Sequence, residues 1–553
     1  MPRLTGLTIV TAALFGLAGG VTAGQDPQAA RPTVTDELRA ALAGGRAPLA
    51  ASTAERAHLS AIYPLAPAPL WVDATGRATA PALQALALFD EASTHGLNPA
   101  SYRPALIAGA AIVAADATGP LPSQSARFDI DLSLGLIRYV HDLHLGRVDG
   151  HALGYHLSAR TDGPDVPALV RDAAAGRLTG ITALAPRLRQ YAALQQALVT
   201  YRALAAAGIP APLPKSSKVI HLDDTFRDAP ALRAFLIAIG DMPADAPDSS
   251  HDVFTPALSD AVKQFQQRHG LTADGTLGLA TQNALRVPLT ARVRQIELSL
   301  ERLRWLPRDP QGPALIVNIP MFRLWSWEAV PSRTVPPVNL KVIVGRARNT
   351  PTPVFSAVLD TVVFRPYWNI PTSILINETL PAIRKDARYL AKNDMEIVRG
   401  DGDRPEIVPL SPDALRLLAQ GALRVRQRPG PKNSLGLIKF VFPNDMSVFM
   451  HGTPAVKLFE RERRDLSHGC VRVEDPVALA EWVLNSSDWP RDAIVKATEG
   501  TDSRSVPVAQ PVRVMLFYAT AAVMPDGVVH FANDLYGHDA ALSSALADER
   551  SLR

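Results

Sequence analysis

Cysteine is nearly absent from this chain: Cys470 is the one such residue among 553. A single thiol cannot form a disulfide within the chain, so the fold has no internal disulfide framework. A lone cysteine is usually buried and inert, and an exposed one is open to oxidation outside the cytoplasm. The role of Cys470 therefore depends on the residues around it.

A strong excess of charge of either sign is also missing. Lys and Arg number 57 and Asp and Glu 53, which gives a formal net charge of +4. This balance lacks the concentrated basic surface that nucleic-acid binders need, so we expect no nucleic-acid partner. Hydrophobic residues make up 47% of the chain, which excludes wholesale disorder. The length and the apolar content together predict two to four domains.

Long hydrophobic runs are missing beyond the first residues. Arg3 supplies a short positive segment, residues 7–21 are uncharged and mostly apolar, and Val21 and Ala23 are small residues before a cleavage point. This order is typical of a secretory signal peptide, here residues 1–23. Retention as an inner-membrane anchor is the alternative, although the apolar stretch is short for a span of about 20 residues. We expect a periplasmic protein.

The first half of the chain has a helical pattern. Residues 34–215 are rich in Ala and Leu at helical spacing, which predicts an all-helical domain. A Pro-rich linker is predicted at 210–215 and a second linker, rich in Pro, Asp and Ser, at 243–250. Residues 250–287 are predicted to form a compact helical module, in which the helix at 256–269 carries a single apolar face.

From about residue 314 the pattern changes to short β-branched runs separated by Pro or Gly. We predict a β-rich domain at 313–500 with a helical insertion at about 372–430. A strand-rich C-terminal tail is predicted at 501–553. The chain as a whole is expected to be a multidomain α+β protein. The predicted strands lie at 315–319, 340–344, 358–364, 437–442 and 446–451.

Two histidines lie near the thiol in sequence. His451 ends an alternating apolar strand, and His468 precedes Cys470 by two residues. A thiol with a pKa of about 8.5 is only a few per cent thiolate at pH 7, so a nucleophilic cysteine needs a neighbouring base or cation. A histidine could take the thiol proton, and its imidazolium could lower the thiol pKa. Gly469 would let backbone N–H groups approach a developing oxyanion.

Other interpretations of these residues stay open at this point. His451, His468 and Cys470 are a possible zinc ligand set, although their spacing is not a recognised ligand motif. His451 could also be an ordinary core or surface histidine. Arg472 could hold a substrate carboxylate or brace its own loop. Aromatic side chains in strands are more often core residues than groove residues.

His451 followed by Ser467-His468-Gly469-Cys470-Val471-Arg472 resembles the signature of the YkuD-type L,D-transpeptidase domain. The segments 426–436, 442–444 and 366–369 are similar to those of the large multidomain Gram-negative members. Gly452 departs from many of those members, which carry an acidic residue there, and His468 departs from some that carry serine. The resemblance implies that Cys470 is the nucleophile and His451 its base, within a motif that also contains Ser467, His468 and Gly469. Arg472, Tyr367, Trp368 and Phe449 are further candidates, which could contact the substrate.

Two further resemblances cover the helical regions. In residues 254–285 the order of Phe-Gln, Gly-Leu, Asp-Gly and Ala-Leu is similar to that of the small three-helix peptidoglycan-binding module. The segments 69–71, 95–97 and 146–148 resemble the scaffold domain of the same large transpeptidases. These likenesses imply that glycan strands bind the 254–285 module.

The resemblance implies a two-step acyl transfer with no metal and no organic cofactor. Cys470 would attack the third residue of a tetrapeptide stem and expel the terminal D-Ala, and a diaminopimelate amine on a neighbouring stem would then form a 3→3 cross-link. The same site could instead hydrolyse cross-links or attach a lipoprotein. A non-catalytic wall-binding scaffold is a further alternative, against which the intact His451 and Cys470 speak. Carbapenems are expected to acylate Cys470.

Overall fold

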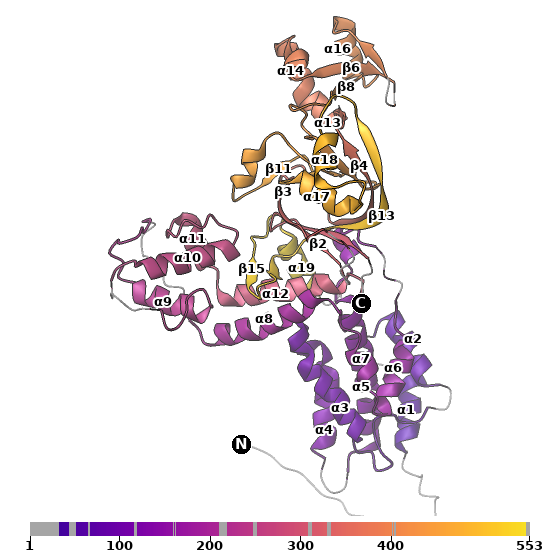
Figure 1. The fold of residues 1–553 in the computed structure, drawn as a ribbon. Helices are drawn as coiled ribbons and strands as arrows, with labels where there is room; N and C mark the ends of the chain where they lie inside the picture. The colour runs from indigo at the N-terminus through magenta and orange to yellow at the C-terminus, as the bar shows by residue number, and fades with distance from the viewer. Residues whose placement is uncertain are drawn as a thin grey trace, which may run out of the picture.

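The computed structural model describes residues 32–43, 51–64, 67–115, 119–158, 160, 162–209, 218–246, 252–307, 312–328, 333, 335–400, 402 and 405–548. The signal peptide predicted at 1–23 and the linker predicted at 210–215 lie outside these residues. The described chain forms a helical N-terminal region, a small helical unit and a β-rich domain with a projecting insertion (Figure 1). The predicted multidomain α+β architecture is confirmed. None of the described helices combines the length and apolarity needed to cross a bilayer.

The N-terminal region packs around one long helix, α5 (Pro122–Leu145), which is buried along most of its length. The carboxylate of Asp129 in α5 accepts hydrogen bonds from the Tyr63 hydroxyl and from the backbone N–H of Trp71, at 2.6 and 2.7 Å. Because a buried carboxylate must be hydrogen-bonded, this contact fixes the loop before α3 on the bundle. The helices around α5 are α1 (Val34–Ala43), α2 (Thr53–Ile62), α3 (Ala80–Glu91), α4 (Arg103–Val113), α6 (Val166–Ala174) and α7 (Thr179–Thr182).

The next helix leaves this bundle. Helix α8 (Arg189–Ala206) lies along α12 (Leu289–Arg304), and its buried face belongs to the hydrophobic cluster of the β-rich domain. The cluster of the N-terminal bundle ends at Leu184. The domain predicted at 34–215 therefore differs from the structure, because the apolar face of α8 meets a helix that follows it by about a hundred residues.

The small helical unit comprises residues 218–285 and begins earlier than the predicted module at 250–287. Helices α9 (Ala229–Ala238), α10 (Pro256–Arg268) and α11 (Leu279–Leu285) share one hydrophobic cluster that runs from Ile220 to Leu285. The stretch at 243–250, predicted as a linker, connects two helices of the same core. Its Pro and Ser residues gave it the composition of a linker, although both flanking helices belong to one unit.

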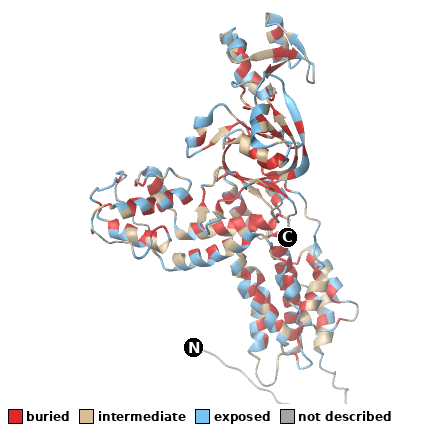
Figure 2. Ribbon diagram, viewed as in Figure 1, coloured by how far each residue is buried: buried red, intermediate tan, exposed pale blue. Residues whose placement is uncertain are grey.

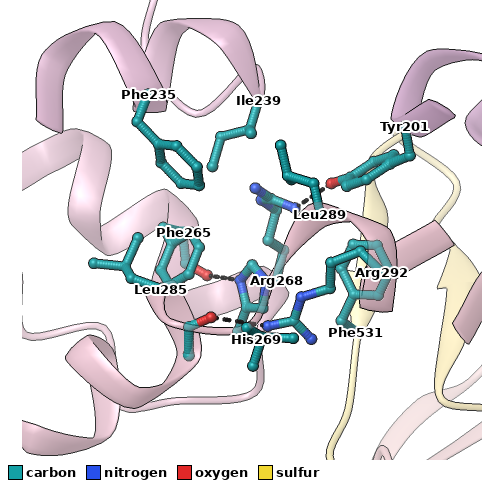
Figure 3. Close-up of a pocket in the computed structure, with 12 residues that line it drawn as sticks. Tyr201, Phe235, Ile239, Phe265, Arg268, His269, Leu285, Leu289, Arg292 and Phe531 are labelled. Carbon is teal, nitrogen blue, oxygen red and sulfur yellow. Dashed lines mark hydrogen bonds between the residues drawn. The ribbon is translucent and has the colours of Figure 1, made fainter. Parts of the chain in front are cut away.

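A junction of buried polar groups joins the small helical unit to α8 and to the hairpin of β14 (Ala521–Val523) and β15 (Val529–Phe531) (Figure 3). Arg268 donates through Nε and Nη2 to the Asp241 carboxylate at 2.6 and 2.5 Å, and through Nη1 to the Tyr201 hydroxyl at 2.8 Å. The ring of His269 stacks between those of Phe265 and Phe531. The unit is thus docked on the rest of the protein.

The β-rich domain is built on a nine-stranded sheet in the order β11-β3-β12-β10-β9-β4-β13-β1-β2. A further pairing of β2 with β3 closes the sheet on itself. The buried residues of this domain gather where the sheet curves (Figure 2). Its strands are β1 (Ala314–Asn318), β2 (Arg323–Trp327), β3 (Asn339–Gly345), β4 (Phe355–Phe364), β9 (Ile438–Val441), β10 (Met450–His451), β11 (Asp465–Ser467), β12 (Val471–Val473) and β13 (Arg504–Phe517).

The segment predicted as a C-terminal tail at 501–553 is part of this domain. Strand β13 lies between β4 and β1, antiparallel to the first and parallel to the second. Helix α19 (His538–Ala547) packs against α12, where Asp539 accepts from the buried Arg302 guanidinium at 2.6 Å. Helices α17 (Pro476–Leu484) and α18 (Arg491–Ala497) lie between β12 and β13 in the chain.

The insertion predicted as helical at 372–430 is mixed. It carries a four-stranded sheet in the order β5-β8-β6-β7, and its own hydrophobic cluster runs from Ile370 to Val425. It projects from the far end of the β-rich domain (Figure 1). Its elements are β5 (Trp368–Asn369), α13 (Thr372–Ile374), η4 (Leu375–Thr379), α14 (Leu380–Lys385), α15 (Tyr389–Lys392), β6 (Met395–Arg399), β7 (Glu406–Val408), α16 (Pro412–Ala419) and β8 (Arg424–Gln427).

Candidate active site

The register of three adjacent strands brings the predicted site residues together. Strand β10 pairs with β9 and β12, so that His451 lies opposite Lys439 on one side and Arg472 on the other. Side chains two residues apart on a strand point to the same face. Cys470, two residues before Arg472, therefore shares a face with His451, and Phe449 shares it too.

The Cys470 thiol is partly buried beside the paired residues Lys439, His451 and Arg472. Its Sγ lies 3.9 Å from the carbonyl oxygen of Ser447. Burial raises the pKa of the Cys470 thiol above its usual range, while the backbone N–H of Phe449 and the nearby Lys439 and Arg472 oppose that rise. The thiol form is therefore the resting state, and the cations beside it favour the thiolate when the proton leaves.

His451 is buried and neutral. Its Nδ1–H donates to the carbonyl oxygen of Gly452 at 2.5 Å, because a carbonyl can only accept. That bond leaves Nε2 as the basic nitrogen. Burial, followed by the positive charge of Arg472, lowers the pKa of His451 to about 3. The sequence led us to expect a His451 imidazolium that lowers the pKa of the thiol. His451 is instead neutral at rest, because its protonation would place a positive charge in a buried site between two cations.

The turn that contains Cys470 is held by hydrogen bonds among its own residues. The Ser467 hydroxyl donates to the Cys470 carbonyl at 2.6 Å and accepts from the Gly469 N–H at 3.1 Å. Gly469 has φ = +115°, a conformation that favours glycine, and no neighbouring atom lies where its Cβ would be. Glycine is therefore needed for the backbone angle. Its N–H is already used, whereas that of Cys470 donates to no group in the described residues.

His468 points away from His451 and toward the insertion. Its Nε2 lies 2.7 Å from the Glu378 carboxylate in η4, and both side chains are partly exposed. The three residues considered as a zinc set are thus not gathered, and the described chain holds no cluster of three or more His, Cys, Asp or Glu side chains fit for a metal ion.

The predicted substrate-contact residues divide into two groups. Phe449 lies at the site, with its ring 4.0 Å from Lys439 Nζ and 5.6 Å from the His451 ring. Tyr367 instead lies under the Arg426 guanidinium, 4.1 Å away, and Trp368 packs on the hydrophobic cluster of the insertion. The structure therefore gathers Phe449 and Arg472 at Cys470 and places the other two aromatics at the base of the insertion.

A brace behind the turn was missed from the sequence. The Thr352 hydroxyl donates to the Gly469 carbonyl at 2.7 Å and accepts from the Gly345 N–H at 2.8 Å. Tyr536 Oη donates to the Gly345 carbonyl at 2.6 Å. A Cβ on Gly345 would lie 2.1 Å from the Thr350 carbonyl oxygen, so only glycine fits there. Nothing in the sequence linked Gly345 to Tyr536, which lies 191 residues further along the chain.

Three models of known protein families match separate parts of the chain. Residues 312–514 match the model of the L,D-transpeptidase catalytic domain, YkuD. The likeness to the YkuD-type L,D-transpeptidase catalytic domain thus falls on the β-rich domain that holds Cys470 and His451. Residues 57–198 match the scaffold domain, and residues 228–285 match a "Putative peptidoglycan binding domain". The last match begins before 250, in agreement with the extent of the small helical unit.

A curated protein that is similar to this chain comes from Haemophilus influenzae. It is named "Putative L,D-transpeptidase", and its sequence is 30% identical to this chain over 252 residues, which are 46% of this chain. The match spans about half of the relative's length, 49%. At the level of the family, the domain implies acyl transfer on peptidoglycan.

Proposed function

We propose that this protein forms 3→3 cross-links between peptidoglycan stem peptides through a thioester on Cys470. The observation that carries the proposal is the position of the chain's one thiol on the same sheet face as His451. Both residues lie within the match to the L,D-transpeptidase catalytic domain.

In the first step His451 Nε2 takes the thiol proton as Sγ attacks the carbonyl carbon of the third residue of a tetrapeptide stem. The amide C–N bond of that residue breaks. The proton held by His451 passes to the leaving amine, and D-Ala departs. Because neutral His451 is the base form, it accepts this proton without prior ionisation of the site.

In the second step an amine of a neighbouring stem attacks the thioester. His451 accepts a proton from that amine, the C–S bond breaks, and the thiolate returns. The Cys470 N–H is the unused backbone donor beside the reacting carbonyl and would stabilise its oxyanion. Phe449 and Arg472 line the approach. No step needs a cofactor.

The setting of the reaction is part of the proposal. The signal peptide at 1–23 would deliver the protein to the periplasm, where its substrates are. The small helical unit at 218–285 would hold glycan strands while the β-rich domain acts on their stems. A β-lactam of the carbapenem type would acylate Cys470, since a thiolate that accepts a peptide acyl group can open a strained lactam.

Incubation of the purified protein with a disaccharide-tetrapeptide, with products identified by mass, tests the reaction. We expect dimers that have lost one D-Ala. The Cys470→Ala variant should give none, while its melting temperature and its binding to insoluble peptidoglycan stay unchanged. Dimers from folded Cys470→Ala would refute the thioester. Monomers shortened by D-Ala would mean that water is the acceptor, and the cross-linking proposal would be wrong.

A further inference from the structure

Two cations beside the thiol lack carboxylate partners. Lys439 and Arg472 form no ion pair with any Asp or Glu of the described chain, whereas Lys341 on β3 of the same sheet pairs with Glu474 at 3.1 Å. The Arg472 Nε is buried and makes no hydrogen bond within the described residues. Both side chains are partly buried, and an anion close by stabilises a cation that has lost part of its hydration.

The anion available at this place is the Cys470 thiolate. The Lys439 ammonium lies over the Phe449 ring, and the backbone of Phe449 lies beside Cys470, since the Val471 N–H donates to the Phe449 carbonyl at 3.1 Å. Lys439 interacts electrostatically with Cys470 as its main charged neighbour, and burial lowers the pKa of the Lys439 ammonium. Aromatic and aliphatic surroundings thus hold the ammonium near the sulfur.

We infer that Lys439 is a positioning residue that supplies the positive charge for the Cys470 thiolate, in place of an imidazolium. The inference deepens the proposed function, because it takes Cys470 as the nucleophile. Lys439 stabilises the thiolate and then the sulfur as leaving group, while His451 moves the proton. These two roles follow from the three paired positions. Lys439 on β9 and Arg472 on β12 carry fixed charge, and His451 between them on β10 is neutral.

The other charged groups around the thiol do not take this role. Arg472 on β12 faces the sulfur, but burial, followed by the positive charge of Arg346 after β3, lowers the pKa of its guanidinium. His451 on β10 is neutral. His468, in the turn itself, is engaged by Glu378 of the insertion. Lys439 on β9 is thus the cation beside the thiol whose charge is not opposed by a neighbouring cation.

Alkylation of the full-length protein by iodoacetamide from pH 5 to 10 tests the inference, and Cys470 is the one thiol that can react. An opposite charge within reach typically shifts a pKa by at least one unit. We expect Lys439→Met to move the alkylation profile about one unit to higher pH, which slows the reaction about tenfold at pH 7.5. Lys439→Arg should restore the profile. At high pH, where every thiol is ionised, the rates of all variants should converge.

Lys341→Met is the matched control. Lys341 lies on β3 of the same sheet but pairs with Glu474 at 3.1 Å, so its removal should leave the profile in place. If Lys439→Met does not fold, Lys439→Gln replaces it with the same expected shift. A Lys439→Met profile that superimposes on that of the wild type, or rates that stay tenfold apart at high pH, would overturn the inference. A shifted profile in a protein that yields no dimers would keep the inference and refute the proposed function.

Discussion

The Arg268→Met substitution removes the guanidinium that joins the small helical unit to helix α8. Arg268 and Asp241 are both buried, and Arg268 makes two charged bonds to that carboxylate and one to the Tyr201 hydroxyl. Loss of one partner of a buried ion pair costs about 3–5 kcal/mol, because the other charge stays buried and unpaired. At about 1.4 kcal/mol per factor of ten, local opening of the unit becomes about 10²–10³ times more frequent.

Hydrogen exchange of the full-length protein, followed by mass spectrometry, measures this opening segment by segment. Amides of α9 and α10 should exchange about 10²–10³ times faster in Arg268→Met, while those of β4 and β13 keep their protection and serve as the internal reference. The Asp241→Asn/Arg268→Met double variant should recover part of the loss, since it leaves no buried charge. Exchange at the wild-type rate in α9 and α10, or a double variant no better protected than Arg268→Met, would refute the reasoning.

The remaining predictions concern the site and acid stability. His451→Ala should lower turnover by about 10²–10⁴-fold in the dimer assay, and a smaller loss than that of His468→Ala would reverse the roles of the two histidines. Intact mass should show one carbapenem adduct on the wild type and none on Cys470→Ala. Burial lowers the pKa of His95 and His538 to about 4 and that of His451 to about 3, so below pH 6.5 the unfolded chain binds protons that the folded one does not. Stability should therefore fall by up to about 1.4 kcal/mol per histidine and pH unit toward pH 4, and a urea midpoint equal at pH 7 and 5 would contradict this.

Local patterns in the sequence pointed to Cys470 and His451 as candidates, and the register of β10 and β12 places both on one face of the sheet. Lys439 escaped notice because its importance comes from strand register, which places it opposite His451 across a pairing that no local pattern records. The strands of the insertion were missed for a different reason. Strand β6 is only five residues long and lies within a stretch whose overall composition is helical.

The order of the strands in the sheet could not be predicted from the sequence either. Strand β13 has the β-branched pattern of a strand, and the sequence placed a strand there, but nothing local shows that it lies between β4 and β1. The same limit applied to α8, whose apolar periodicity was evident while its partner α12 was not. Periodicity identifies which face is buried, and the packing partner is set by the whole fold.

The position of β13 and Tyr536 in the chain bears on how the enzyme is made. A ribosome completes His451 and Cys470 before it reaches residues 504–536, which supply the strand between β4 and β1 and the hydroxyl that holds Gly345. A nascent chain that ends after Cys470 has its thiol and its base but neither the middle of the sheet nor the brace behind the turn. The order of synthesis thus places Cys470 in the chain before the domain around it can close.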